Sequence, residues 1–243
     1  MNSRKKLFSY APYIILFFIL IVLDLVNCSY DLIWGDEGFT LRLVRSGSIR
    51  EMMTAIINDV HPPLYYFGLR IAGKIFGDSV FIYKIASGVF YYVTLVMFWA
   101  FYRKEFRHEI VFMLGIFYGT MPALKHVSEI RMYPMALFFV SAFSFVAFRI
   151  LKNEDRANNK KYFVLAILGI CAAYTHYFAL VDIAVLLLAA TAYSLLTANK
   201  KAGKFFAVGS LIILSYLPWI VVTMKQVNVG SSSTVISYQR DQL

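Results

Sequence analysis

Two adjacent carboxylates, Asp36 and Glu37, stand in the motif WGDEGF at residues 34–39. A positioned carboxylate can act as a general base that takes a proton from a hydroxyl group. The simpler alternative is a pair of acidic residues at a helix N-terminus, where the helix dipole favours negative charge. Both interpretations remain open at this point.

A second group of ionisable residues lies in ALKHVSEIRMYPM, residues 123–135. Arg131 and Lys125 are the side chains there that can bind an anionic group such as phosphate, and Glu129 and Tyr133 stand beside them. The alternative for Arg131 is an interfacial residue that pairs with Glu129 and extends its charged end into water.

His61, His126 and His176 add further polar groups, and Asp182 follows the last of them within an apolar run. Histidine and carboxylate side chains bind zinc, but these histidines come from separate segments without closely spaced ligand motifs. We therefore expect no metal site and no required cofactor. An ionisable group such as Asp182 within a span usually faces a cavity or a partner.

The composition indicates what kind of protein must position these groups. The chain has 243 residues, of which 60% are hydrophobic and 16% are charged. Soluble domains average about 45–50% apolar and about 25% charged residues, so a membrane protein is expected. The net charge of +10 is then explained by cytoplasmic loops rather than by nucleic-acid binding, because no basic face on a soluble domain is evident.

A bilayer core takes about 20 helical residues, and the chain offers seven apolar runs near that length. They are Tyr10–Val26, Val80–Tyr102, Ile110–Ala123, Tyr133–Leu151, Tyr162–Tyr174, Tyr177–Leu196 and Phe205–Met224. We expect an all-α, polytopic membrane protein whose first run is a retained signal anchor, since no clear cleavage pattern follows it. Cys28 and Cys171 are expected to be buried free thiols rather than a disulfide.

The basic loops at 102–109, 151–161 and 197–204 are separated by even numbers of crossings, and together with Arg4–Lys6 they define one side. The positive-inside rule makes that side cytoplasmic. The N-terminus is therefore expected inside the cell, and residues 225–243 form an external tail after a membrane module at 1–224.

Residues 28–79 form one long external loop in this topology, with helices expected around Gly38–Val44 and Ile49–Asn58. The segment His61–Gly77 is expected to be an amphipathic helix in the outer interface. As a span it would carry Arg70 and Lys74 into the membrane, at about 2.5–3.5 kcal/mol each near its centre. We expect both cations to turn to water or headgroups instead.

The unusual polar groups gather on the external side in this topology, which predicts an external working face. Nucleotide sugars are cytoplasmic, so an external sugar transferase would need a donor that reaches the outer leaflet. A sugar on a polyprenyl phosphate meets that need. A carboxylate would activate the acceptor hydroxyl, and Arg and Lys would stabilise the phosphate leaving group.

Five motifs, WGDEGF, HPPLYY, SEIRMYPMAL, YTHYFAL and YLPWI, occur in an order and spacing similar to those of GT-C-fold glycosyltransferases. The chain resembles most the bacterial branch related to protein O-mannosyltransferases and lipid A aminoarabinose transferases. The resemblance covers the N-terminal transmembrane module alone. It implies inverting transfer of a sugar from a polyprenyl-phosphate donor, on the outer face of the cell membrane, to a glycan, lipid or protein acceptor.

The resemblance also implies roles for individual residues. Asp36 and Glu37 match the family's catalytic acidic pair, and Arg131 and Tyr133 match the element whose arginine lies near the donor phosphate. His61 and His176 match positions that line the site. Some GT-C relatives use a divalent cation, so Mg²⁺ or Mn²⁺ stays an open alternative to the expected absence of a cofactor.

Family members usually run to about twice this length, so a further C-terminal part is expected beyond the tail. The alternative function is a non-catalytic membrane protein, either a transporter-like bundle or an inactive truncated partner subunit. Transporters place ionisable groups near the bilayer midplane, whereas here they cluster at the outer ends of the spans.

Overall fold

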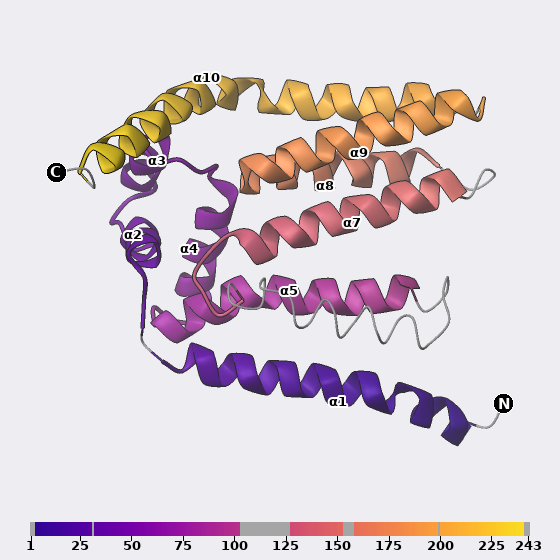
Figure 1. Ribbon diagram of the computed structural model, residues 1–243, viewed down its shortest axis with the longest axis horizontal. Coiled ribbons are helices and arrows are strands. Elements are labelled where there is room, and N and C mark those ends of the chain that lie inside the picture. The colour runs from indigo at the N-terminus through magenta and orange to yellow at the C-terminus, as the bar shows by residue number, and fades with distance from the viewer. Residues whose placement is uncertain (1–2, 31, 103–126, 153–157, 199, 241–243) are drawn as a thin grey trace. The chain divides into compact units, whose positions relative to one another are not determined.

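The computed structural model describes residues 3–30, 32–102, 127–152, 158–198 and 200–240. Every regular element in these ranges is a helix (Figure 1). The helices are α1 (Ser3–Cys28), α2 (Gly35–Val44), α3 (Ile49–Ile57), α4 (Leu64–Phe76), α5 (Val80–Tyr102), α7 (Tyr133–Lys152), α8 (Asn159–Thr175), α9 (Tyr177–Leu196) and α10 (Ala202–Arg240).

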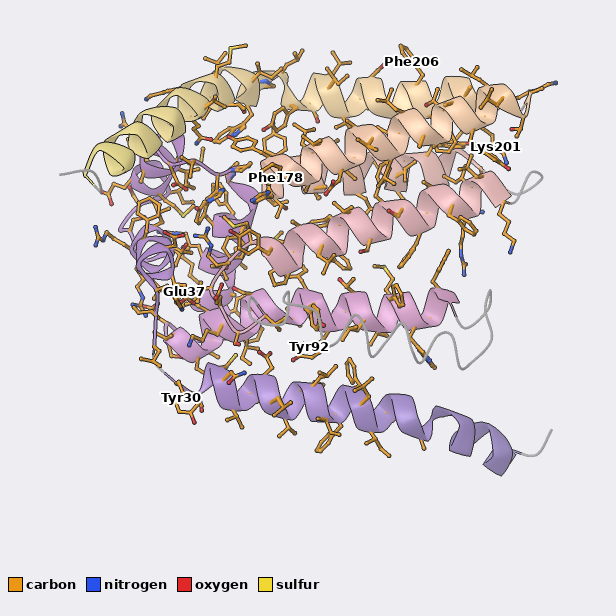
Figure 2. The ribbon with its side chains drawn as sticks, in the orientation of Figure 1. Tyr30, Glu37, Tyr92, Phe178, Lys201 and Phe206 are labelled. Carbon is orange, nitrogen blue, oxygen red and sulfur yellow. The ribbon has the colours of Figure 1, made fainter. Side chains whose placement is uncertain are left out.

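Within the described ranges, four helical stretches are long and apolar enough to cross a membrane: Val80–Phe101, Tyr133–Lys152, Tyr177–Leu196 and Ala202–Val227. Ile14–Cys28 in α1 is apolar but shorter. Large apolar side chains project outward from these helices, as Phe206 does from α10, where it is 73% exposed (Figure 2). Exposed apolar surface of this kind indicates a protein embedded in a membrane.

Each expected span except Ile110–Ala123 falls on a helix, and that segment lies outside the described residues, as do Lys125 and His126. The count of seven spans therefore stays a prediction. The last helix differs from expectation, because α10 continues beyond Met224 to Arg240. It carries Pro218 in its interior, where proline removes one backbone hydrogen bond and bends a helix.

The helices expected in the segment 28–79 are confirmed with shifted ends. α2 begins at Gly35 and so contains the acidic pair in its first turn. α3 begins after Ser48, whose side chain accepts from the Glu51 N–H at 3.1 Å, while the Glu51 carboxylate accepts from the Ser48 N–H at 3.2 Å. This reciprocal capping box satisfies two backbone donors at the helix start.

The chain forms two compact units. The first contains residues 1–38 and 71–138, and the second contains residues 39–70 and 139–243. In the first unit α1 packs on α5 around a core of Leu20, Tyr91, Leu95 and Val127. The Tyr92 hydroxyl on α5 donates to the Leu20 carbonyl at 3.1 Å. Val127, at the start of the segment 127–132, thus packs with α1 and α5.

Helices α8, α9 and α10 pack on one another in the second unit. The buried side chain of Gln226 on α10 donates from Nε2 to the Ile56 carbonyl at 2.6 Å and bonds the Tyr177 hydroxyl through Oε1. These bonds join the far half of α10 to α3 and α9.

The expectation that Arg70 turns to water is wrong. Its side chain is buried, and Nη1 donates to the backbone carbonyls of Val44 at 3.1 Å and Ser46 at 2.7 Å. The turn after α2 leaves these carbonyls without helical partners, and the guanidinium supplies donors for them. Lys74, on the same helix, is exposed as expected.

Both cysteines are free thiols, as expected. Cys28 is buried and Cys171 is half-buried.

Gly88 on α5 allows a close approach to the segment 127–132. A Cβ atom at this position would lie 2.7 Å from the Val127 carbonyl oxygen and 3.3 Å from Asp24 Oδ2. A backbone carbonyl cannot rotate away as a flexible side chain can, so Gly88→Ala should destabilise the first unit by about 1–3 kcal/mol. The apparent midpoint of thermal unfolding in detergent measures the effect.

Gly68→Ala is the matched control, because Gly68 also lies within a helix and its added Cβ would meet no atom within 4 Å. Alanine is the better helix former by about 0.5–1 kcal/mol, so this variant should unfold at or slightly above the wild-type midpoint. Equal midpoints for Gly88→Ala and wild type would contradict the close approach.

Candidate active site

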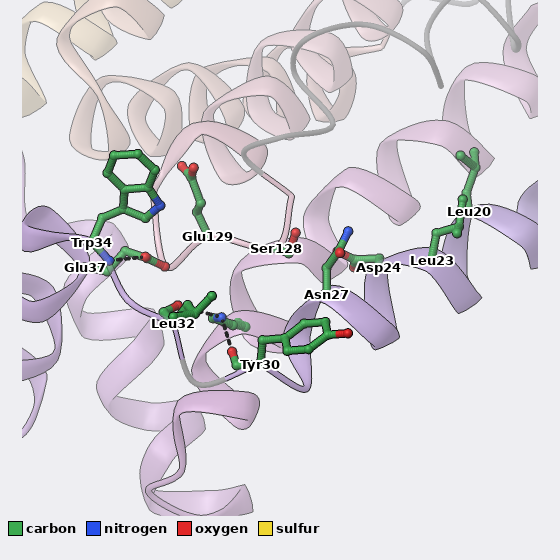
Figure 3. Close-up of a pocket in the computed structure, with 11 residues that line it drawn as sticks. Leu20, Leu23, Asp24, Asn27, Tyr30, Leu32, Trp34, Glu37, Ser128 and Glu129 are labelled. Atoms are coloured by element: carbon green, nitrogen blue, oxygen red, sulfur yellow. Dashed lines mark hydrogen bonds between the residues drawn. The ribbon is translucent and has the colours of Figure 1, made fainter.

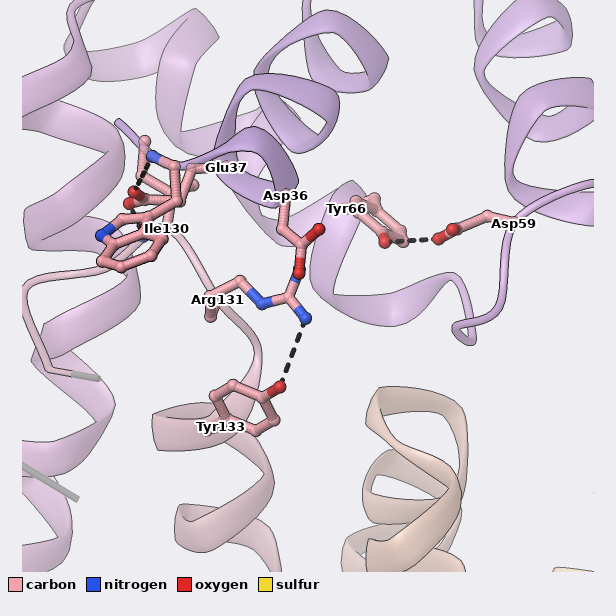
Figure 4. A network of polar contacts seen from close by, with 8 residues as sticks. Asp36, Glu37, Asp59, Tyr66, Ile130, Arg131 and Tyr133 are labelled. Carbon is pink, nitrogen blue, oxygen red and sulfur yellow. Dashed lines mark hydrogen bonds and ion pairs between the residues drawn. The ribbon is translucent and has the colours of Figure 1, made fainter. Parts of the chain in front are cut away.

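The Glu37 carboxylate binds backbone N–H groups and stabilises the local structure. Its side chain is buried, and both oxygens accept backbone hydrogen bonds: Oε2 from Trp34 N–H at 2.8 Å and Oε1 from Ile130 N–H at 2.7 Å. The first bond caps the start of α2, and the second ties that start to the segment 127–132 (Figure 4). Hydrogen bonds to a charged acceptor are roughly twice as strong as neutral ones, so Glu37 holds these two segments together.

Asp36 has the opposite exposure. Its side chain is 75% exposed, and Oδ2 lies 3.2 Å from Arg131 Nη1. The two neighbouring carboxylates are therefore unequal, because one is enclosed by backbone N–H groups and the other is accessible to a substrate.

Arg131 is the cationic centre of this cluster. Its side chain is only 12% exposed, although its partner Asp36 is accessible. Nη2 donates to the Tyr133 hydroxyl at 3.2 Å, and the guanidinium carbon lies 5.4 Å from the centre of the Tyr133 ring. Figure 4 shows the guanidinium between the Asp36 carboxylate and the Tyr133 hydroxyl. An arginine held on two sides in this way is oriented before any ligand binds.

A pocket of about 300 Å³ opens at the cluster. Its lining comprises Trp34, Gly35, Asp36, Glu37, Glu129, Arg131 and Tyr133. The sequence-predicted residues of the first unit that the structure describes, namely Asp36, Glu37, Glu129, Arg131 and Tyr133, thus surround one pocket.

A larger cavity of about 460 Å³ shares Trp34, Glu37 and Glu129 with that pocket (Figure 3). Its further lining residues are Leu20, Leu23, Asp24, Asn27, Tyr30, Leu32, Lys84 and Ser128. Leucine and aromatic side chains form part of its wall, and charged or amide groups form the rest. The shared residues show that this mixed, partly apolar cavity adjoins the pocket at the Asp36–Arg131 pair.

Sequence reasoning missed several residues of this cavity, above all Asp24 and Lys84. Asp24 is 6% exposed and Lys84 is 4% exposed, and both lie in apolar helices. The available signal was the presence of an ionisable side chain within an apolar run, which by itself marks a functional candidate.

The predicted site residues His61, His176 and Asp182 belong to the second unit. The rings of His61 and His176 lie 5.5 Å apart at 30°. His176 caps α9, because its Nδ1 accepts from the Phe178 N–H at 3.2 Å. Asp182 is exposed on α9. The second unit also contains the bond from the Tyr66 hydroxyl to Asp59 at 2.7 Å, drawn in Figure 4.

Among the described residues, no group of three or more histidine, cysteine, aspartate or glutamate side chains has an arrangement that could hold a metal ion. Comparison with protein-family models, curated proteins and solved structures finds no match. The functional proposal therefore depends on the residues and their geometry.

Proposed function

We propose that this protein is a membrane glycosyltransferase of the GT-C type, which transfers a sugar from a polyprenyl-phosphate donor to an acceptor hydroxyl on the outer face of the cell membrane. The observation that carries the proposal is an exposed carboxylate, Asp36, 3.2 Å from the oriented guanidinium of Arg131, in a pocket that adjoins a partly apolar cavity. A lipid-linked donor has an apolar chain, which matches the partly apolar cavity, and an anionic phosphate, which matches the Arg131 guanidinium.

Asp36 acts as the general base in this proposal. It removes the proton of the acceptor hydroxyl, whose oxygen forms a bond to the anomeric carbon of the sugar. The bond between that carbon and the phosphate oxygen breaks, and polyprenyl phosphate leaves with the bonding electrons. A single displacement of this kind inverts the anomeric configuration.

Arg131 stabilises the negative charge that develops on the departing phosphate, because a guanidinium offers several N–H donors in a planar arrangement suited to phosphate oxygens. Tyr133 orients Arg131 through its hydroxyl. Lys125 is a second candidate for the phosphate by its place in the sequence.

The abundance of carboxylates around the pocket also supports sugar transfer. Glycosyl transfer passes through a transition state with positive, oxocarbenium-like charge on the sugar ring. Asp36, Glu37 and Glu129 line the pocket together with one arginine. The carboxylates favour the positive ring, and Arg131 favours the negative leaving group.

A donor panel tests this function. Membranes that contain the full chain are incubated with acceptor hydroxyl compounds and with either a polyprenyl-phosphate sugar or the matching nucleotide sugar. Mass spectrometry of the extracts then detects any sugar transferred to an acceptor. Transfer from the lipid-linked donor alone is expected. Transfer from the nucleotide sugar alone, or no transfer from either donor, would contradict the proposal.

A further inference from the structure

Lys84 is a buried cation near the start of α5. It lies in the second turn of that helix, and its side chain is only 4% exposed. Removing an ammonium group from water costs several kcal/mol unless the protein supplies compensating partners. A lysine in this position therefore needs an explanation in the contacts it makes.

The contacts are two backbone carbonyls of the connection between α1 and α2. Lys84 Nζ donates to the Tyr30 oxygen at 2.6 Å and to the Leu32 oxygen at 3.0 Å. Both residues precede the acidic motif by only a few positions. The ammonium group thus supplies hydrogen-bond donors to two carbonyls that lie between the two helices.

The other end of the connection is fixed by Glu37, which accepts from Trp34 N–H and from Ile130 N–H. Lys84 of α5 therefore binds two carbonyls of this connection, and Glu37 of α2 binds one of its N–H groups. Asp36 lies in the same helical turn as Glu37, and Arg131 directly follows Ile130. The position of the Asp36–Arg131 pair consequently depends on both attachments.

Direct binding of the donor phosphate by Lys84 is the competing explanation, because Lys84 lines the larger cavity. An ammonium group has three donors, and two of them are used by the carbonyls. Arg131, the cation proposed for the phosphate, lines the neighbouring pocket and is not among the described residues that line this cavity. The geometry therefore favours a role for Lys84 in positioning the protein backbone over direct contact with the donor phosphate.

We infer that Lys84 is a positioning residue, which holds Tyr30 and Leu32 in the connection between α1 and α2 and thereby places Asp36 beside Arg131 for the reaction. The inference depends on the proposed function for its catalytic consequence, although the attachment itself can be measured without any substrate. Lys84→Met removes the ammonium group at nearly constant length, and Lys84→Arg keeps a cationic donor.

The experiment is amide hydrogen exchange of the full chain in lipid nanodiscs, followed by mass spectrometry of peptides that cover residues 29–40. Lys84→Met should speed exchange in these peptides by about tenfold or more, since opening of a local segment becomes easier when its attachment is lost. Exchange in α8, α9 and α10 should stay as in wild type. Lys84→Arg should restore most of the protection, and Lys74→Met, an exposed lysine of the same unit, should leave exchange unchanged.

Transfer kinetics give the second readout. A shift of about 1 Å caused by a remote substitution can lower turnover by about a hundredfold. Lys84→Met should therefore lower kcat by about that factor while the donor KM changes by less than about threefold, because Arg131 and the cavity remain. Lys84→Arg should recover most of kcat.

Unchanged exchange of residues 29–40 in Lys84→Met would overturn the inference. It would also be overturned if exchange rose equally throughout α1 and α5, which would indicate general support of the unit, or if exchange rose locally while kcat stayed at the wild-type value. Absence of transfer by the wild-type chain from every donor would overturn the proposed function instead, and the exchange result would still decide whether Lys84 holds the connection.

Discussion

Asp36→Asn is expected to lower the rate of sugar transfer by about 10²–10⁴-fold, the usual contribution of a general base. The amide has nearly the same shape as the carboxylate but cannot accept the proton of the acceptor hydroxyl. Asp36 is 75% exposed, and ion pairs at such positions stabilise a protein by only about 0–1 kcal/mol. The unfolding midpoint should therefore stay near that of wild type, and initial rates at equal protein amounts in reconstituted membranes measure the loss.

Glu37→Gln, in contrast to Asp36→Asn, should lower the thermal stability of the protein. Both Glu37 oxygens accept from backbone N–H groups, and the amide of glutamine replaces one acceptor with a donor. Loss of a hydrogen bond to a buried charged group costs about 1.5–3 kcal/mol, so this variant should unfold at a clearly lower temperature. The pair thus separates into a carboxylate for chemistry and a carboxylate for structure.

Asp78→Asn is the matched control for Asp36→Asn, because Asp78 is an exposed aspartate of the same unit and lies outside the lining of both pockets. It should transfer sugar at the wild-type rate. Near-normal transfer by Asp36→Asn would show that Asp36 is not the base. Near-normal transfer by both Asp36→Asn and Glu37→Gln would show that neither carboxylate takes part in the reaction.

Arg131→Ala is expected to reduce transfer by about 10²–10³-fold, as loss of one preorganised group that stabilises transition-state charge does in other enzymes. Arg131 lies between Asp36 and Tyr133, so alanine removes the leaving-group contact and the orientation of the base together. Apparent donor affinity should fall as well, because the phosphate is charged in the bound donor. Titration of the polyprenyl-phosphate sugar gives both kcat and KM.

Arg131→Lys tests geometry against charge. Lysine keeps the positive charge but has no planar pair of N–H groups that can reach Asp36 and Tyr133 together. Intermediate activity is expected, with kcat affected more than KM. Arg50→Ala on α3 serves as control, since Arg50 is exposed and lies outside both pocket linings. Wild-type kinetics in Arg131→Ala would show that another cation binds the phosphate.

The apolar runs predicted the helices well, because a span must satisfy its backbone internally and therefore reads as a long apolar helix. The capping box at Ser48 and Glu51 is local, so it too could be read from the sequence. Convergence of Asp36 and Arg131 was predictable from topology, since both segments were expected at the same side of the membrane.

The division of labour between Asp36 and Glu37 could not be predicted. It depends on Ile130 N–H, which reaches Glu37 from a segment 93 residues away in the chain. Burial of Arg70 escaped prediction for the same reason, because its acceptors are carbonyls of the turn after α2. The structure brings His61 and His176 close to each other within the second unit. That they share one site with the acidic pair stays a prediction.

The most direct test of the central proposal is to locate the donor on the protein. A polyprenyl-phosphate sugar with a photoreactive group in its first isoprene units is bound to the full chain in nanodiscs, irradiated and mapped by mass spectrometry. The expected cross-links lie in residues 20–34 and 127–133, decline when unlabelled polyprenyl phosphate competes, and weaken strongly in Arg131→Ala. Cross-links confined to α8, α9 and α10, or equal in wild type and Arg131→Ala, would contradict a lipid-phosphate site at the Asp36–Arg131 pair.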